Sequence, residues 1–309
     1  MKKIAFIFPG QGSQKLGMGK DFYEHSILAR QMLEKASDRV GFDFKALLFD
    51  ENALLEQTEF AQPAILLVSL MAYALYRESM PQSPFLALGH SLGEFSAVAA
   101  MGAMGYEDAV ALVHQRGLLM KEACVGANAG MMALLGLDDE RVEQLTCKAR
   151  EEGKKVWAAN YNGDGQIVIA GNRDDLASLE PLFKEAGAKK SVLLPMSVAS
   201  HCPLLLSAQE PLSHFLDQWL QGTFEAPIVS NVTARVYQSK EEAKDLLAQQ
   251  LIMPVKYKQS ILHVEQELDC FIECGGSVLK GLNKRITQKP TYSISDMKSL
   301  EEVLKEVQA

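Results

Sequence analysis

The stretch Gly89-His90-Ser91-Leu92-Gly93 constrains this chain more than any other, because it joins an apolar run to an Ala-rich run. The residue patterns predict a strand over residues 85–88 and a helix over residues 94–101. Between a strand and a helix, the pattern G-x-S-x-G predicts a sharp turn that leaves the serine hydroxyl exposed. We therefore expect Ser91 to act as a covalent nucleophile, with an ordinary glycine-rich turn as the alternative.

Strand and helix signals alternate through the rest of the chain, which predicts an α/β fold. We expect a hydrolase-like, mostly parallel sheet with helices on both faces. Its strands are predicted at residues 4–8, 85–88, 227–231 and 270–274, and its further helices at residues 21–40, 62–79, 106–124, 203–220, 240–251 and 278–286.

A small-residue, glycine-rich stretch at residues 125–130 marks a boundary inside this pattern. The segments that follow have the order strand, helix, strand, strand, helix, strand, which is the ferredoxin-like order. They are predicted at residues 131–135, 138–151, 155–159, 166–170, 174–186 and 191–194. We therefore expect a ferredoxin-like α+β subdomain over residues 126–195, inserted into a large catalytic α/β subdomain formed by residues 1–125 and 196–309.

Composition narrows the class of protein. The chain has 309 residues, 48% of them hydrophobic, and a net charge of −8, which argues against a nucleic-acid binder. The apolar run that ends at Pro9 is too short for a secretion signal, and no stretch reads as long enough to cross a membrane. The five cysteines, an odd number, indicate reduced thiols. We expect a cytoplasmic protein that binds neither nucleic acid nor membranes.

Cofactor motifs are weak in this sequence. Cys270 and Cys274 lie on one side of a predicted strand, but no second Cys/His pair stands at metal-ligand spacing, so we predict no metal site. Gly10-Gln11-Gly12 could open a dinucleotide site, but Lys15 stands where the third glycine is needed. We expect no cofactor.

A serine nucleophile needs donors for the oxyanion that forms during acyl transfer. The backbone N–H of Leu92, at the predicted helix N-terminus, is one candidate donor. The backbone N–H of Gln11 is the other, because its glycine-rich loop follows the predicted strand at residues 4–8.

Six histidines compete for the role of general base. His90 is adjacent to Ser91 and should point away from it. His201 is favoured because it follows a small-residue loop and begins a predicted helix, a position where catalytic groups are often presented. A structural histidine stays open as the alternative. No acidic residue is singled out as a third member, which weakens a triad-hydrolase interpretation.

The ordered set of motifs closely resembles the malonyl-CoA:acyl carrier protein transacylases of type II fatty acid synthesis, over nearly the whole length of the chain. The residues that carry the resemblance are Gly10-Gln11-Gly12-Ser13-Gln14, Gly89-His90-Ser91-Leu92-Gly93-Glu94, Gln115-Arg116-Gly117, Ala159-Asn160-Tyr161-Asn162, Ser200-His201, Gln250-Leu251 and Gly275-Gly276-Ser277-Val278-Leu279.

The resemblance implies roles for these positions. Ser91 would attack the malonyl thioester and His201 would move the proton, with the main-chain carbonyl of Gln250 orienting the imidazole in place of a carboxylate. Arg116 would pair with the free malonyl carboxylate, since a guanidinium offers two parallel donors. Asn160 would contact the substrate.

The same resemblance implies ping-pong transfer from malonyl-CoA to the phosphopantetheine thiol of an acyl carrier protein. We expect a monomer, although the sequence leaves the oligomeric state open. Ser200 stands where malonyl-selecting polyketide acyltransferases carry Phe, so the choice of acyl group and the kind of carrier stay open. A serine esterase or thioesterase, and a scaffold that binds the carrier without catalysis, are the alternatives.

Overall fold

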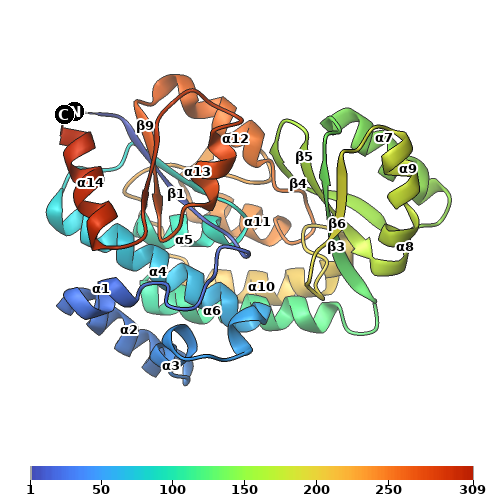
Figure 1. Cartoon of the computed structure of the whole chain (residues 1–309). Helices are drawn as coiled ribbons and strands as arrows, with labels where there is room; N and C mark the ends of the chain where they lie inside the picture. The colour runs from blue at the N-terminus through green and yellow to red at the C-terminus, as the bar shows by residue number, and fades with distance from the viewer. Residues whose placement is uncertain (1, 309) are drawn as a thin grey trace.

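The computed structural model describes residues 2–308, and two sheets organise this part of the chain (Figure 1). The larger sheet has six strands in the order β10-β9-β1-β2-β7-β8. Its neighbours run parallel except for β8, which pairs antiparallel with β7. The strands are β1 (Ile4–Phe8), β2 (Leu86–Gly89), β7 (Ile228–Val229), β8 (Val236–Tyr237), β9 (Cys270–Cys274) and β10 (Thr291–Ile294).

Helices cover both faces of the larger sheet, as the sequence predicts. The first face carries α1 (Lys20–His25), α2 (Ile27–Val40), α3 (Phe44–Phe49), α4 (Thr58–Ser79), α5 (Leu92–Ala100), α6 (Tyr106–Ala123), α10 (Leu206–Trp219), α11 (Lys240–Gln249) and α14 (Met297–Gln308), whose apolar side chains share one core. The opposite face packs against α12 (Tyr257–Val264) and α13 (Val278–Asn283).

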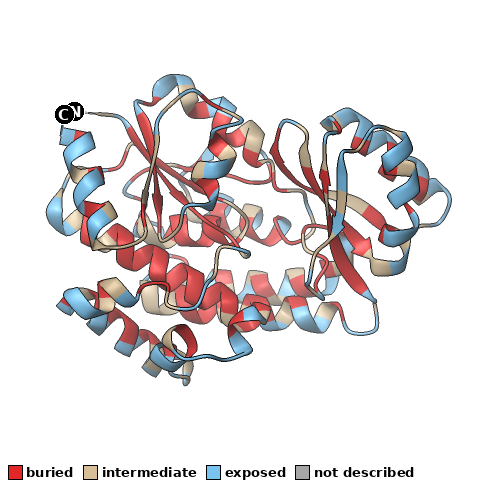
Figure 2. Cartoon of the chain, viewed as in Figure 1, coloured by how far each residue is buried: buried red, intermediate tan, exposed pale blue. Residues whose placement is uncertain are grey.

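The central strand β1 shows why the sheet is buried on both faces. Ile4, Phe6 and Phe8 enter the core beneath α4 and α5, whereas Ala5 and Ile7 enter the core beneath α12 and α13. Alternate side chains therefore serve opposite faces, so the strand reads as one continuous apolar run. Figure 2 shows α4 and the central strands of both sheets as buried, whereas β6 (Lys190–Leu193), at one edge of the smaller sheet, is largely exposed or intermediate.

The smaller sheet lies to one side of the larger one and has the strand order β4-β5-β3-β6, with every pair antiparallel. Its elements occur in the order described by the sequence pattern, and this pairing agrees with a ferredoxin-like arrangement. The boundaries at residues 126 and 195 stay a prediction. The elements are β3 (Ala129–Leu135), α7 (Asp139–Glu151), β4 (Val156–Gly163), β5 (Gln166–Asn172), α8 (Arg173–Ser178), α9 (Glu180–Glu185) and β6 (Lys190–Leu193).

Some predicted boundaries are wrong. The helix predicted over residues 21–40 breaks at Ser26, whose backbone is extended and whose hydroxyl caps α2 by accepting the N–H of Ala29. The helix predicted over residues 174–186 is two short helices that meet at Leu179. The sequence analysis also did not single out α3, α12, α14, β8 or β10.

Helix α4 is long and apolar enough to cross a membrane, contrary to the sequence interpretation. In the structure, 89% of its most apolar window is buried inside the protein, which identifies it as a core helix. It begins four residues earlier than predicted and includes Pro63. Proline has no N–H for the carbonyl of Glu59, and His114 Nδ1 contacts that carbonyl instead at 2.7 Å.

The sharp turn between β2 and α5, which we call the elbow (residues 89–93), requires glycine at position 93, where α5 meets β1. A Cβ atom on Gly93 would overlap the carbonyl oxygen of Phe8, so only a hydrogen atom fits there. Gly281 in α13 is a matched control, because a Cβ atom at that position would meet no atom within 4 Å.

We expect Gly93→Ala to lower the free energy of unfolding by about 3 kcal/mol, since the helix must move away from β1. Gly281→Ala should leave it unchanged or raise it by about 0.5 kcal/mol, because alanine favours the helix. Urea denaturation measures both. Equal effects of the two substitutions would show that Gly93 is not held against β1.

Candidate active site

Ser91 stands at the sharp turn that the sequence predicts, directly after β2 and before α5. Its backbone has φ 54° and ψ −109°, a conformation that is uncommon for a residue with a side chain. Two buried amide side chains hold it there: Asn231 Oδ1 accepts the Ser91 N–H at 2.7 Å, and Gln250 Nε2 donates to the Ser91 carbonyl at 3.0 Å. The surrounding structure therefore determines where the hydroxyl points.

His201 lies directly against Ser91, with 2.7 Å between Nε2 and the serine Oγ. Its Nδ1 lies 2.7 Å from the main-chain carbonyl of Gln250. A carbonyl can only accept, so Nδ1 carries the proton and Nε2 presents its lone pair to the serine hydroxyl. The imidazole is thus held in the tautomer that a general base needs.

The structure corrects the local setting of His201. The residue does not begin a helix as predicted; it occupies a bend with φ 61°, and the 3₁₀ helix that follows starts at Pro203. A hydrogen-bonded base can be held in this uncommon conformation because the side chain is buried and both ring nitrogens are engaged.

Burial and, to a smaller extent, the nearby positive charge of Arg116 lower the pKa of His201 to about 3, against an opposite effect of the Gln250 carbonyl. The imidazole of the free protein is therefore neutral at neutral pH. A neutral imidazole is the form that accepts a proton.

Arg116 is buried in this site, with 1% of its surface exposed, although helix α6 carries it at a position where an exposed arginine would also fit the sequence. Its Nη1 donates to Gln62 Oε1 at 2.6 Å, and its Nη2 donates to Gln250 Oε1 at 3.1 Å and to Ser91 Oγ at 3.3 Å. The guanidinium also lies over the ring of Phe95, with 5.0 Å to the centroid. Burial lowers its pKa to about 10, so it stays charged at neutral pH.

Arg116 has donors to spare. A guanidinium has five N–H groups, and only three of them make the hydrogen bonds described above. Buried donors are almost always paired, so the guanidinium can take a further acceptor in the cavity that it lines. A carboxylate is the group that matches a guanidinium best.

The two predicted oxyanion donors lie at the same cavity. Gln11 and Leu92 both line it, and Leu92 begins α5, so its N–H lies in the first turn of the helix. Neither backbone N–H donates to an acceptor in the described part of the chain. Both donors are therefore free for an oxygen atom in the cavity.

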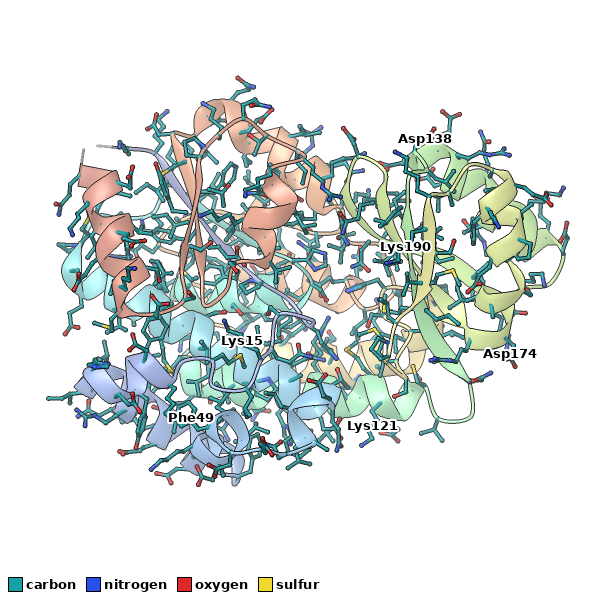
Figure 3. The ribbon with its side chains drawn as sticks, viewed as in Figure 1. Lys15, Phe49, Lys121, Asp138, Asp174 and Lys190 are labelled. Atoms are coloured by element: carbon teal, nitrogen blue, oxygen red, sulfur yellow. The ribbon has the colours of Figure 1, made fainter. Side chains whose placement is uncertain are left out.

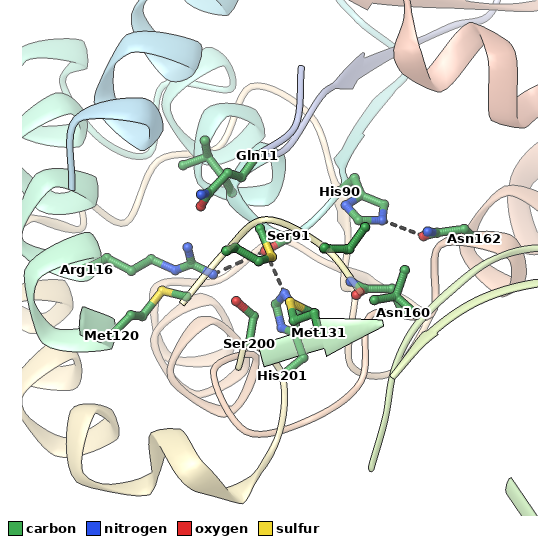
Figure 4. Close-up of a pocket in the computed structure, with 14 residues that line it drawn as sticks. Gln11, His90, Ser91, Arg116, Met120, Met131, Asn160, Asn162, Ser200 and His201 are labelled. Atoms are coloured by element: carbon green, nitrogen blue, oxygen red, sulfur yellow. Dashed lines mark hydrogen bonds between the residues drawn. The ribbon is translucent and has the colours of Figure 1, made fainter. Parts of the chain in front are cut away.

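The cavity beside Ser91 has a volume of about 140 Å³ (Figure 4). It lies between the two sheets, because its lining comes from the elbow, from α6 and from β3, β4 and β5. The lining residues are Gln11, His90, Ser91, Leu92, Arg116, Met120, Met131, Asn160, Asn162, Val168, Leu194, Met196, Ser200 and His201. A space of this size accommodates a small acyl group.

The polar side chains on the smaller sheet have distinct positions. Asn160 is buried and lines the cavity, as predicted for a substrate contact, although its role stays a prediction. Asn162 Oδ1 lies 2.7 Å from His90 Nε2, so the ring of His90 points towards β4 and not towards Ser91 (Figure 4). This contact joins the elbow to the smaller sheet.

The structure thus brings together all seven residues that the sequence analysis selected, and their roles stay predictions. Ser91, His201, Gln250 and Arg116 are joined by hydrogen bonds, and Gln11, Leu92 and Asn160 line the cavity beside them.

Sequence reasoning missed Asn231 and Gln62, which position Ser91 and Arg116. The position of Asn231, a polar residue just beyond the carboxyl end of β7 beside β2, is the only signal that could have found it. Within residues 2–308, the structure contains no group of three or more His, Cys, Asp or Glu side chains placed to hold a metal ion.

Comparisons with family models and with known proteins agree on one family. The model of the acyl transferase domain family matches residues 5–301. The malonyl CoA-acyl carrier protein transacylase of Bacillus subtilis is 40% identical over 305 residues, which cover 97% of this chain and 96% of that protein. The Escherichia coli K12 protein of the same name is 36% identical over 296 residues, 95% of this chain and 96% of that protein.

Solved structures agree. The malonyl-CoA:acyl carrier protein transacylase of Helicobacter pylori superposes with a TM-score of 0.97 at 46% identity, covering 100% of this chain and 99% of that chain. A malonyl transacylase solved in complex with its type II polyketide synthase acyl carrier protein superposes with a TM-score of 0.94 at 35% identity, covering 98% and 99% of the two chains.

Proposed function

The chain belongs to the acyl transferase family, and from this premise we propose that it transfers a malonyl group from malonyl-CoA to the phosphopantetheine thiol of an acyl carrier protein through an ester on Ser91. The observation that carries the proposal is the contact of Ser91 Oγ with both a neutral imidazole and a buried guanidinium. The first prepares a nucleophile, and the second recognises an acid group on the acyl chain.

In the first half-reaction, Ser91 Oγ attacks the thioester carbon of malonyl-CoA while His201 Nε2 accepts the hydroxyl proton. The carbonyl oxygen becomes an oxyanion that the N–H groups of Gln11 and Leu92 stabilise. When the carbon–sulfur bond breaks, His201 returns the proton to the departing thiolate of CoA. The products are the malonyl ester of Ser91 and free CoA.

In the second half-reaction, the thiol of the carrier's phosphopantetheine group repeats these steps in reverse. His201 Nε2 accepts the thiol proton, sulfur attacks the ester carbon, and the proton goes to Ser91 Oγ as the ester bond breaks. Acyl transfer of this kind needs only proton movements, so the proposal includes no metal and no redox cofactor. The supporting observation is that one imidazole contacts the serine oxygen that gains and loses the acyl group.

The position of Arg116 favours an acyl group that carries a second, free carboxylate. In malonyl, the carboxylate is one methylene away from the reacting carbonyl, and Arg116 Nη2 lies 3.3 Å from the attacking Ser91 Oγ. The N–H groups of the Arg116 guanidinium that make no hydrogen bond in the structure supply further donors. Binding of the carboxylate would also offset the positive charge that lowers the pKa of His201, so the base would strengthen as the correct substrate binds.

The wider setting is part of the same proposal. The supply of malonyl groups to an acyl carrier protein fits fatty acid biosynthesis in the cytoplasm, where the carrier and CoA esters are dissolved. We propose that the chain acts as a monomer, since the proposed reaction needs no residue from a second copy.

Intact-mass spectrometry tests the proposed function in two steps. Malonyl-CoA alone should add one malonyl group to the protein, and holo acyl carrier protein should then remove it and gain the same mass. Ser91→Ala should take up no malonyl group, because it lacks the nucleophile. Release of malonate to water in place of transfer would indicate an esterase, and absence of labelling would indicate a non-catalytic carrier-binding protein.

Arg116→Ala should lower the rate of malonyl transfer by about 100-fold or more, because a buried charge pair with the substrate is lost. Transfer from acetyl-CoA lacks that pair, so its rate relative to malonyl should rise. The ratio of the two rates, measured with one preparation, corrects for any loss of folded protein. An unchanged ratio would contradict the role of Arg116.

Carrier docking is expected at two groups of basic side chains. Lys280 lies in α13, and Lys284, Arg285 and Lys289 follow that helix; Lys184 lies in α9, Lys189 directly precedes β6, and Lys190 begins it. Arg285 Nη1 donates to Gln166 Oε1 at 3.1 Å, which joins the first group to β5. Gln166 pairs with Leu135, and Leu135 pairs with Lys190, so Arg285 and Lys190 lie towards the same end of the strands of the smaller sheet. Figure 3 shows Lys190 on β6. An acidic carrier would contact both groups.

The double charge reversal Lys284→Glu/Arg285→Glu should raise the KM for the carrier about 10-fold and leave the KM for malonyl-CoA unchanged, because the proposal places the acidic carrier, and not CoA, against these two side chains. Lys298→Glu/Lys305→Glu on α14 changes the net charge equally and is the matched control. Steady-state kinetics with each substrate varied in turn measures both constants. Equal effects on the two constants would count against docking at α13.

A further inference from the structure

A buried carboxylate, Glu94, accepts hydrogen bonds from Gln250 and Asn231, the two residues that contact Ser91. It lies in the first turn of α5, has no exposed surface, and takes no part in the mechanism described above. Its Oε2 accepts a hydrogen bond from Gln250 Nε2 at 2.7 Å and another from the backbone N–H of Asn231 at 3.1 Å. Both partners are themselves fully buried.

Gln250 makes hydrogen bonds with His201, Ser91 and Arg116. Its main-chain carbonyl orients His201, its side-chain Nε2 donates to the Ser91 carbonyl, and its side-chain Oε1 accepts from Arg116. The two ends of a glutamine amide differ only in being donor or acceptor, so the amide can be turned end for end at little cost unless its neighbours forbid it.

Glu94, the Ser91 carbonyl and Arg116 together prevent that turn. A carboxylate and a carbonyl accept only, so both require Nε2 of Gln250 on their side, and a guanidinium donates only, so it requires Oε1 on the other. If the acceptor at Glu94 were removed, Nε2 would lose its shortest hydrogen bond, the amide would be held less firmly, and the buried N–H of Asn231 would have no acceptor.

Asn231 is the second link to the nucleophile. Its backbone N–H donates to Glu94 Oε2, its Oδ1 accepts the Ser91 N–H at 2.7 Å, and its Nδ2 donates to the Gly89 carbonyl at 2.7 Å. The uncommon backbone conformation of Ser91 is therefore held by the side chains of two residues that each donate one hydrogen bond to the same carboxylate.

We propose that Glu94 is a positioning residue: as a hydrogen-bond acceptor it fixes the amide of Gln250, and through Gln250 it sets His201 for proton transfer and Arg116 for acid recognition. This inference rests on the proposed malonyl transfer. According to this proposal, the carboxylate of Glu94 acts on His201 through Gln250 and does not contact the imidazole itself.

The electrostatic setting agrees with this role. Burial raises the pKa of Glu94 to about 7, and the hydrogen bonds from Gln250 and Asn231 together with the charge of Arg116 oppose that rise. Burial and the same carboxylate raise the pKa of Tyr237 well above its ordinary value, and the Tyr237 hydroxyl in turn opposes the rise in the pKa of Glu94. The Tyr237 hydroxyl therefore lies beside this carboxylate, whose Oε2 makes the contacts with Gln250 and Asn231.

These contacts define informative variants. Glu94→Gln keeps an acceptor oxygen at the position of Oε2, and its amide nitrogen takes the position of Oε1, where the neighbouring Tyr237 hydroxyl can also accept a hydrogen bond. Glu94→Met keeps similar volume and provides no acceptor. Gln250→Ala removes the amide and keeps the main-chain carbonyl that orients His201. Glu273→Ala is the matched control, since Glu273 is equally buried and accepts two backbone N–H groups, those of Leu279 and Lys280, away from the cavity.

The experiment measures transfer of malonyl and of acetyl from their CoA esters to a small thiol, with a thermal unfolding midpoint for each variant. We expect Glu94→Met to lower the malonyl rate about 100-fold and the malonyl-to-acetyl ratio about 10-fold, because both the base and the guanidinium lose their support. Glu94→Gln should recover both values to within about threefold. Glu273→Ala should lower the unfolding midpoint and leave the ratio unchanged.

Non-additivity gives the most specific readout. If Glu94 acts through the amide of Gln250, Glu94→Met should add less than about threefold to the loss already caused by Gln250→Ala. Multiplying effects would overturn the proposal, and so would a Glu94→Gln variant as impaired as Glu94→Met. If Glu94→Met does not fold, Glu94→Asp, whose shorter side chain withdraws the acceptor, takes its place.

The outcomes also separate this inference from the proposed function. A wild-type protein that fails to transfer malonyl at all would overturn the proposed function. A wild-type protein that transfers malonyl, with a Glu94→Met variant of unchanged rate and ratio, would overturn only the role of Glu94.

Discussion

The hydrogen bond between His201 Nδ1 and the main-chain carbonyl of Gln250 is the contact on which the site depends. It fixes the tautomer that leaves a lone pair at Nε2, 2.7 Å from the serine oxygen. A carbonyl orients the ring as a carboxylate does, but it contributes no negative charge to stabilise the imidazolium. The base therefore stays neutral until substrate arrives, which suits a residue that lies beside a permanent cation.

That cation imposes a second constraint. Arg116 is buried with Gln62, Gln250 and the ring of Phe95 as partners, and none of these side chains is an anion. Burial of a charge without a direct counter-ion is costly, and the cost falls when a carboxylate occupies the cavity. The same feature that destabilises the empty site thus favours an acyl group with a free acid over a neutral one.

The sequence predicted the parts of this site that have local signatures. The elbow at Ser91 follows from glycine spacing between a strand and a helix, and the parallel sheet follows from the alternation of elements. The role of the Gln250 carbonyl came only from family resemblance, because every residue has a carbonyl and no side-chain pattern marks one. The burial of Arg116 and the support from Asn231 arise from contacts between segments far apart in the chain, which periodicity within one helix cannot show.

The most direct test of the account is the pH dependence of kcat/KM for acylation of Ser91 by malonyl-CoA, which reports the ionisation of the free enzyme. Because burial and Arg116 lower the pKa of His201, the neutral base should persist below pH 6.5, the ordinary value for histidine. The account predicts a constant kcat/KM from pH 8 to at least about one unit below 6.5, with circular dichroism confirming a folded protein. A fall in kcat/KM centred at or above pH 6.5 would contradict it.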